Sequence, residues 1–337
     1  NALCMRAVRF RDERVPCPRG GPPLILSWAE NNPTMPLPGC AAGDSDAAPI
    51  LLMLHGLMCD ANDLPGTSFI HTAVRRGWKV VVWNRPGHRV PLETPRFSLF
   101  GDYRDLDAVV GHIKLRYPNR TLGAIGFSAG CYPALRYLGE RGEASAIDAT
   151  VMISGGLSVD DSMYKCGWFF AACFVSKAKG FFLRANEAVL RAHDNDGYER
   201  ALAAGTTSEF LRALSPFMCD TGAWPDAKRI IDPLPTMGNI QSPCLFINAL
   251  DDPIVPVESV DPYMDTFFKR NRNVLLAQTV TGSHCPFLDG FGGDDWSLKA
   301  SFEFLAHQCR IRQLRRNAKA AAEAGRVRSP AASPVGK

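Results

Sequence analysis

The chain has 337 residues, of which 46% are hydrophobic and 21% are charged, so it holds enough apolar material for a large core. This composition excludes a disordered chain, and no apolar run approaches the ~18 residues that a bilayer-spanning helix needs. The formal net charge of +4 is concentrated near the C-terminus, where residues 308–337 contain eight Lys and Arg residues against Glu323 alone.

Short apolar runs alternate with helical stretches along most of the chain, which predicts a mostly parallel sheet with helices on both faces. Residues 6–28 are expected to form the first strands, and residues 33–46 form a loop rich in Pro, Gly and Ala. Further strands are expected near residues 50–54, 79–83, 122–126, 149–153, 244–248 and 274–279. Helices are expected near residues 62–76, 102–117, 129–139 and 297–316. This order predicts the α/β class.

The strand predicted at residues 50–54 ends in His55-Gly56-Leu57. A backbone N–H in a loop that directly follows a buried strand can contribute to an oxyanion hole, which stabilises negative charge that develops on a reacting carbonyl oxygen. Leu57 is therefore the first candidate donor. For the imidazole of His55 we favour a packing role beside a tight turn.

Residues 126–130 (Gly-Phe-Ser-Ala-Gly) fit the pattern Gly-x-Ser-x-Gly and lie between a predicted strand and a predicted helix. A serine in such a turn holds its hydroxyl above the sheet edge, and the glycines leave room for a strained backbone. Ser128 is the candidate nucleophile, and Ala129 is the second candidate N–H donor. The pentapeptide alone also fits a Gly-rich turn without a catalytic role, so the assignment depends on the segments that follow.

Residues 156–240 interrupt the alternation with helical stretches and aromatic clusters. We expect them to form a helical cap over Ser128. The chain then divides into an N-terminal part of the core (1–155), the cap (156–240), a C-terminal part of the core (241–316) and a disordered basic tail (317–337). The most hydrophobic window, residues 168–175, fits either a cap helix packed on the core or a segment that dips into a lipid interface.

Two late strands lead into the remaining candidates. Asp251 and Asp252 follow the strand predicted at residues 244–248, and His284 follows the strand predicted at 274–279. The chain order Ser128, Asp252, His284 is that of α/β-hydrolases and differs from the orders in chymotrypsin and subtilisin. Asp251 is the alternative acid, but Asp252 directly precedes a Pro-containing turn and is favoured.

With these motifs in place, the chain resembles a family of α/β-hydrolases. The family includes YheT-like bacterial hydrolases, yeast ethanol acyltransferases for medium-chain acyl groups, and mammalian membrane-anchored enzymes that cleave medium-chain phospholipids. The resemblance runs from about residue 24 to about residue 309. Besides the motifs above, it rests on residues 76–85, 91–97 and 284–290, and the block at 91–96 (Pro-Leu-Glu-Thr-Pro-Arg) is its most specific part. It implies an α/β-hydrolase fold with an inserted helical cap and a triad of Ser128, Asp252 and His284.

The chain departs from the family pattern at three places, the segments 129–132 (Ala-Gly-Cys-Tyr), 84–88 (Asn-Arg-Pro-Gly-His) and 282–287 (Gly-Ser-His-Cys-Pro-Phe). None of these departures removes a catalytic group. Tyr132 and Pro286 are expected to line the edge of the site, so the departures bear on substrate preference and not on the type of reaction.

Three functions are compatible with these features. The first is a serine esterase or lipase that cleaves carboxylic acyl esters, with medium-chain or lipid esters implied by the resemblance. The second is an alcohol O-acyltransferase that uses the same triad, and the third is a hydrolase-fold protein that only binds a ligand. The intact triad argues against the third. The 11 cysteines show neither regular spacing nor a Cys-x-x-Cys pair, so we expect no disulfide framework, no metal and no cofactor.

The expected partner is the acyl-ester or lipid substrate, and no specific nucleic-acid partner is expected. The cap and the basic tail are candidate membrane contacts, although a solvated tail with no partner explains the tail charge equally well. The chain begins at Asn1 and not at Met, so we expect that an N-terminal segment with any signal or anchor is missing. The localisation is left open between cytoplasmic and membrane-associated.

Overall fold

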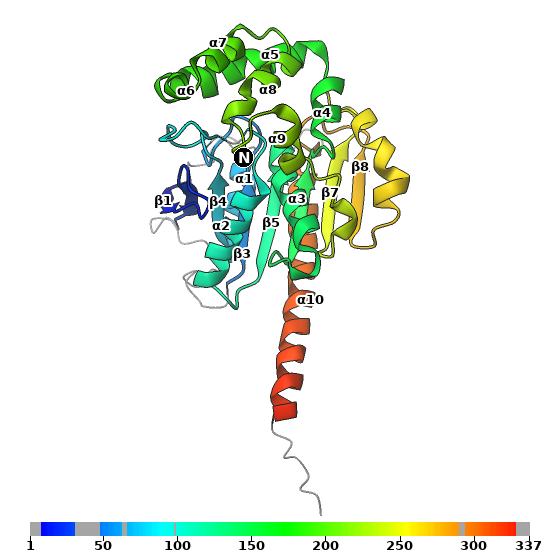
Figure 1. Ribbon diagram of the computed structural model, residues 1–337. Helices are drawn as coiled ribbons and strands as arrows, with labels where there is room; N and C mark the ends of the chain where they lie inside the picture. Colours follow the sequence, from blue (N-terminus) through cyan, green and yellow to red (C-terminus); the bar gives the residue numbers. More distant parts are fainter. Residues whose placement is uncertain (1–7, 31–47, 63–65, 98, 290–293, 328–337) are drawn as a thin grey trace, which may run out of the picture.

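The computed structural model describes residues 8–30, 48–62, 66–97, 99–289 and 294–327. Within these residues the chain forms an 8-stranded sheet in the order β1-β2-β4-β3-β5-β6-β7-β8 (Figure 1). The six strands from β4 to β8 are parallel, whereas β1 and β2 extend one edge in antiparallel pairing. The strands of this sheet are β1 (Phe10–Val15), β2 (Leu24–Ala29), β3 (Ile50–Leu54), β4 (Lys79–Asn84), β5 (Leu122–Phe127), β6 (Ala149–Ile153), β7 (Cys244–Ala249) and β8 (Val274–Thr279).

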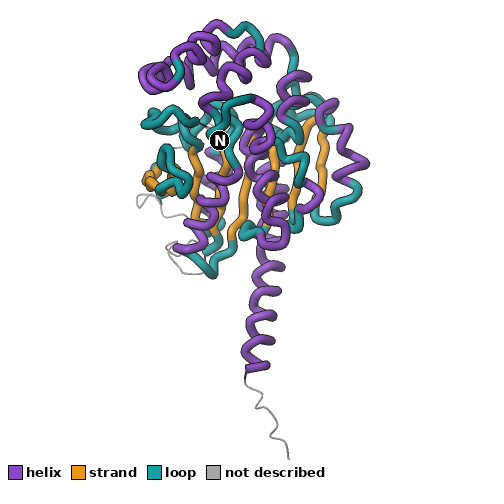
Figure 2. Tube along the Cα trace, viewed as in Figure 1, coloured by secondary structure: helices purple, strands orange, loops and turns teal. Residues whose placement is uncertain are grey.

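The inner strands are apolar along their whole length because both faces of the sheet are covered (Figure 2). Along β3, alternate side chains enter different clusters. Leu52 and Leu54 pack in a cluster with α2 (Tyr103–Arg116) and α3 (Cys131–Arg141). Leu51 and Met53 point to the other face and pack in a cluster with α1 (Thr67–Arg75) and α10 (Trp296–Val327). The expected arrangement of helices on both faces is therefore confirmed.

The segment between β6 and β7 is helical and stacks over one end of the sheet (Figures 1 and 2). Its α-helices are α4 (Val159–Lys165), α5 (Trp168–Ala178), α6 (Glu187–His193), α7 (Asn195–Ala203), α8 (Thr207–Leu214) and α9 (Trp224–Ile231). Polar side chains cap the N-termini of several of these helices. Ser158 caps α4, Asp194 caps α7, and Thr206 forms a reciprocal capping box with Glu209 at the start of α8. Two short strands, β9 (Leu288–Asp289) and β10 (Asp294–Asp295), pair with each other before α10.

Residues 91–97 join this helical segment to the sheet. The Leu92 N–H donates to Asn186 Oδ1 at 2.8 Å, and the Phe97 N–H donates to the Phe217 carbonyl at 2.9 Å. The Phe97 ring also stacks on Phe182, with ring centroids 5.1 Å apart. The block that is most specific to the resemblance therefore anchors the helical segment to the core.

Several elements are longer in the structure than the sequence predicts, and each is longer at its C-terminal end. The strands predicted at 79–83, 122–126 and 244–248 each continue by one residue. The last helix, predicted to end near 316, continues to Val327, so residues 318–327 of the tail that we expected to be disordered are helical. Five of these residues are alanine, which has the highest intrinsic helix propensity. The predicted loop at 33–46 and residues 328–337 lie outside the described residues.

Candidate active site

Ser128 lies in a strained turn between β5 and α3. Its φ of 50° is in the left-handed region, which serine rarely adopts. The two glycines of the motif are required by close approaches of the backbone. A Cβ at Gly130 would lie 2.1 Å from the Leu54 carbonyl oxygen, and one at Gly126 would lie 3.0 Å from the Gly130 carbonyl oxygen. The turn therefore sits directly against the end of β3, as the motif predicts.

His284 connects Ser128 with a buried carboxylate. Its Nε2 lies 2.9 Å from Ser128 Oγ, and its Nδ1 lies 2.8 Å from Asp252 Oδ2 and 3.0 Å from Oδ1. A carboxylate only accepts, so Nδ1 carries a proton, and in the neutral imidazole Nε2 accepts from the serine hydroxyl. The Asp252 residue is 3% exposed, and its Oδ1 also accepts from the N–H groups of Ile254 and Val255, each at 2.9 Å.

The neighbours of His284 change its proton affinity. Burial disfavours the imidazolium, but the interactions with Cys285 and with the Asp252 carboxylate outweigh burial and raise the pKa of His284 to about 10. The backbone of Cys285 is held in turn, because its N–H donates to Ser154 Oγ at 3.0 Å and its φ is 76°.

Asp251, the alternative acid, points elsewhere. It is exposed, and its Oδ1 accepts from the Ser283 N–H at 2.7 Å. It holds the loop that carries His284 without contacting the imidazole in any hydrogen bond of the described residues.

The two candidate oxyanion donors flank Ser128. Gly56, which precedes Leu57, lies so close that a Cβ there would be 3.6 Å from Ser128 Cβ. Ala129 follows Ser128 and is buried in an apolar cluster that it shares with residues of the helical segment such as Phe182 and Phe210, and Leu57 is partly buried against the same cluster. His55 is buried, as its predicted packing role requires.

The predicted edge residues differ in exposure. Tyr132 is buried, and its hydroxyl contacts Ser162 Oγ at 2.8 Å and the Ser158 carbonyl at 3.2 Å, which ties α3 to α4. Burial raises the pKa of Tyr132, so its hydroxyl stays protonated. Pro286 is exposed.

The sequence analysis did not identify Arg85, which contacts the loop that carries Leu57. Arg85 is buried and donates to the carbonyls of His55 and Gly56, each at 2.6 Å. The sequence marks the position of this residue but not its contacts, because Arg85 lies two positions after the apolar run 80–83 and within one of the segments that depart from the family pattern.

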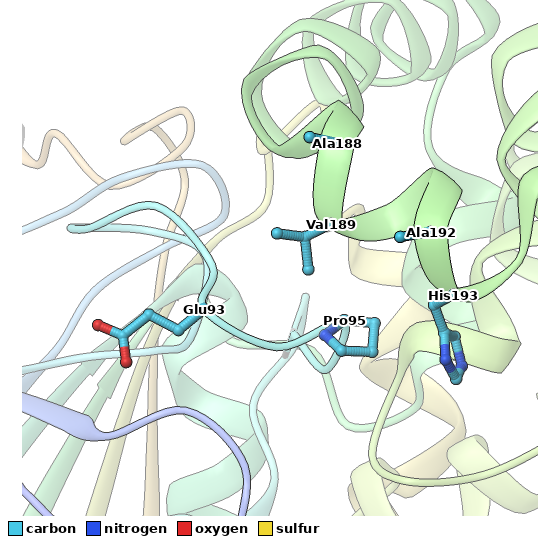
Figure 3. Close-up of a pocket in the computed structure, with 6 residues that line it drawn as sticks. All are labelled: Glu93, Pro95, Ala188, Val189, Ala192 and His193. Atoms are coloured by element: carbon cyan, nitrogen blue, oxygen red, sulfur yellow. The ribbon is translucent and has the colours of Figure 1, made fainter.

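A surface hollow of about 490 Å³ lies between residues 91–97 and the helix α6. Figure 3 shows Glu93 and Pro95 on one side and side chains of α6 on the other. The residues of α6 that line it are Ala188, Val189, Ala192 and His193. None of its lining residues is Ser128, Asp252 or His284, so this hollow is distinct from the serine site.

The predicted hydrophobic window forms the exposed start of α5. Trp168 is 83% exposed and Phe169 is 57% exposed, and Phe170 and Tyr164 are also exposed, whereas Val175 is buried. The window therefore packs on the core only through its later part.

Among the described residues no single helix is long and apolar enough to cross a membrane. Val159–Lys165 and Trp168–His193 meet the length and composition requirements together, but with a bend of 111°. Within the part of the chain that the structure describes, no group of three or more His, Cys, Asp or Glu side chains is suited to hold a metal ion.

Comparisons with known proteins show the family of this chain. The sequence model of a family described as "Alpha/beta hydrolase family" matches residues 51–292. Phospholipase ABHD3 of Mus musculus is 26% identical over 293 residues, which cover 84% of this chain and 67% of that protein. Protein ABHD15 of Homo sapiens is 30% identical over 262 residues, which cover 73% of this chain and 54% of that protein, so the chain spans only part of these relatives.

A solved structure confirms the expected fold. The Pyrococcus furiosus esterase Pf2001 superimposes with a TM-score of 0.57 at 20% sequence identity, over 89% of this chain and 91% of the esterase.

Proposed function

Because this chain belongs to the alpha/beta hydrolase family, we propose that it is a serine hydrolase that cleaves carboxylic acyl esters. The observation that carries the proposal is the chain of contacts from Ser128 Oγ to His284 and on to the buried Asp252 carboxylate. A serine hydroxyl is a weak nucleophile until a base within hydrogen-bond reach takes its proton, and His284 meets that requirement.

In the proposed reaction, Ser128 Oγ attacks the ester carbonyl carbon while His284 Nε2 takes the hydroxyl proton. Asp252 keeps the proton on Nδ1 and stabilises the imidazolium. The oxyanion of the tetrahedral intermediate accepts hydrogen bonds from the Leu57 and Ala129 N–H groups. His284 then gives the proton to the leaving alcohol, and an acyl-enzyme remains on Ser128. Water, activated by the same imidazole, attacks this ester and releases the carboxylic acid and free Ser128.

Medium-chain or lipid esters are the substrates that we propose. The apolar cluster of the cap continues down to Ala129, next to the nucleophile, and an acyl chain gains about 0.8 kcal/mol for each buried CH₂. The name of the relative Phospholipase ABHD3 agrees with such a substrate. We also propose that residues 156–240 form the cap and that residues 1–155 and 241–316 form the two parts of the core.

A lipid surface is the partner that we propose for the exposed start of α5. Residues 162–183 contain Lys165, Lys177 and Lys179 but no Asp or Glu, and since Lys165 Nζ lies 3.0 Å from Asp161 Oδ1, Lys177 and Lys179 supply the positive charge of this surface. Exposed aromatic side chains next to lysines suit the boundary between headgroups and acyl chains of an anionic membrane. The junction before α5 also lies near the site, since Lys165 Nζ donates to the Glu258 carbonyl at 2.9 Å in the loop that follows Asp252.

Labelling with a fluorophosphonate probe tests the proposed function. The wild type should label at Ser128, and Ser128→Ala should fold normally and lose the label, because no other serine of the described residues contacts His284 in a hydrogen bond. Ser283→Ala is the matched control, since Ser283 is an exposed serine adjacent to His284, and it should label like the wild type. Labelling that persists in Ser128→Ala would remove Ser128 from the mechanism.

A further inference from the structure

Arg85 is a buried cation without an anionic partner. The residue is 1% exposed, and the structure pairs it with no carboxylate among the residues that it describes. Burial lowers its pKa to about 9, so the guanidinium stays charged at neutral pH. Its Nε has no hydrogen-bond partner in the described part of the chain. An unpaired charge in an apolar interior is costly, so this arginine calls for an explanation beyond packing.

Two of its hydrogen bonds converge on one short stretch of backbone, and Nη2 also lies 3.4 Å from His88 Nε2. Nη1 donates to the His55 carbonyl and Nη2 to the Gly56 carbonyl, each at 2.6 Å. The backbone N–H of Arg85 donates to His55 Nε2 at 3.2 Å, which leaves the imidazole proton on Nδ1. That Nδ1 lies 2.9 Å from the Gly56 carbonyl oxygen and donates to it. The Gly56 carbonyl thus accepts from a guanidinium and from an imidazole.

The Gly56 carbonyl and the Leu57 N–H belong to the same planar peptide group. Donors at a peptide oxygen pull electron density from the nitrogen, and hydrogen bonds in such chains strengthen one another. The bonds also fix the orientation of the peptide plane. Both effects favour a hydrogen bond from the Leu57 N–H to a negatively charged oxygen beside Ser128.

We propose that Arg85 is a positioning residue of the oxyanion hole, which orients and polarises the Gly56–Leu57 peptide group through the Gly56 carbonyl. The inference rests on the proposed serine-hydrolase function. The absence of a carboxylate partner is then part of the mechanism, because a paired anion would cancel the potential that favours the oxyanion. The neighbouring His88 does not compete for this role, since burial and the Arg85 charge lower its pKa and keep it neutral.

Two substitutions separate charge from packing. Arg85→Gln keeps an N–H donor of reduced reach and removes the charge, whereas Arg85→Lys keeps a cation. Arg120→Met is the control, because Arg120 is also buried but lies at the opposite end of β5 from Ser128. The readouts are kcat and KM for one p-nitrophenyl ester, Tm, and the Ki of an alkyl trifluoromethyl ketone. This ketone forms a tetrahedral oxyanion on the active serine.

Arg85→Gln is expected to lower kcat by about 10–100-fold and to weaken ketone binding by the same factor, with little change in KM, because loss of a whole oxyanion donor costs about 10²–10³-fold. Arg85→Lys should retain at least about a third of the wild-type kcat and at least about a third of the wild-type affinity for the ketone. Arg120→Met should lower Tm without changing Ki.

Unchanged ketone affinity in a folded Arg85→Gln enzyme would overturn the role of Arg85. An increase in KM by the same factor as the increase in Ki would also overturn it. If Arg85→Gln fails to fold, Arg85→Lys decides, and a loss of more than about 30-fold in Ki at unchanged Tm refutes the charge argument. Fluorophosphonate labelling of the wild type is measured alongside. An unlabelled wild type overturns the proposed function, whereas a labelled wild type with an unaffected variant overturns only this inference.

Discussion

His284 Nε2 lies 2.9 Å from Ser128 Oγ, although 156 positions separate the two residues in the chain. The contact arises from the sheet. β5 leads into Ser128, β8 leads into the loop of His284, and parallel strands bring their carboxyl ends to one edge. Since β6 and β7 lie between them, the distance between nucleophile and base depends on the register of four strands.

Asp252 and Asp251 should differ in their effect on turnover. Asp252→Asn should lower kcat by about 10⁴-fold, because an amide at this position favours the wrong imidazole tautomer. Asp251→Asn should change kcat by less than about tenfold and cost at most about 1 kcal/mol of unfolding free energy, since its bond to the Ser283 N–H is exposed. Steady-state kinetics and thermal unfolding of both variants give the comparison. A reversed order of the two effects would move the acid to Asp251.

The pH profile should reflect the raised pKa of His284. Only the neutral imidazole accepts the serine proton, so kcat/KM should rise with pH, with a midpoint above the ordinary value of 6.5 and towards about 10. For stability the sign is opposite. The folded state binds the proton more tightly than the unfolded chain, so this contribution is fully present below about pH 6.5 and is lost as the pH rises through the folded pKa.

Cys285→Ala is the matched variant for this profile, because the contact with Cys285 helps to raise the pKa of His284. The midpoint of kcat/KM should move to lower pH without loss of the plateau rate. A midpoint at or below 6.5 in the wild type would contradict the raised pKa.

Acyl-chain length should control the specificity constant. Each CH₂ buried against the cap contributes about 0.8 kcal/mol, which corresponds to an increase of about fourfold in kcat/KM. A series of p-nitrophenyl esters from acetate to octanoate, with a constant leaving group, measures the slope. A flat profile, or a maximum at acetate, is incompatible with a lipid substrate and would leave a small-ester hydrolase.

The exposed start of α5 should mediate lipid binding. Replacing Trp168, Phe169 and Phe170 by alanine should reduce flotation with anionic vesicles at least tenfold and leave turnover of a soluble ester unchanged, because these side chains are exposed and stabilise little of the fold. Leu115→Ala is the control, since Leu115 is 85% exposed on α2, outside the cap. Removing residues 318–337 should also preserve soluble-ester turnover. Equal flotation of the triple variant and the wild type would exclude this surface.

The core strands and the turn at Ser128 were predictable because their signals are local. A run such as residues 50–54 is apolar at every position, which indicates a strand covered on both faces, and the glycines at 126 and 130 mark a turn with no room for side chains. The choice of Asp252 over Asp251 depended on one adjacent proline, and the structure shows the physical difference in burial.

Other features depend on contacts between distant segments, which a single sequence does not reveal. Nothing near Arg85 in the chain indicates that its guanidinium reaches the carbonyls of residues 55 and 56. The extension of α10 was missed for a different reason. The Ala-, Ser- and Pro-rich composition of the tail predicts disorder, whereas the five alanines of residues 318–327 favour a helix, and the helix is what forms there.

The position of α10 limits how the molecule can lie on a membrane. The helix has 32 residues, about 48 Å at 1.5 Å per residue, and its carboxyl end projects from the side of the sheet opposite the cap (Figure 1). The exposed start of α5 and the described end of α10, at residue 327, therefore lie at opposite ends of the molecule (Figure 1). A protein that stands end-on to a bilayer through the start of α5 holds the described end of α10 away from the lipid.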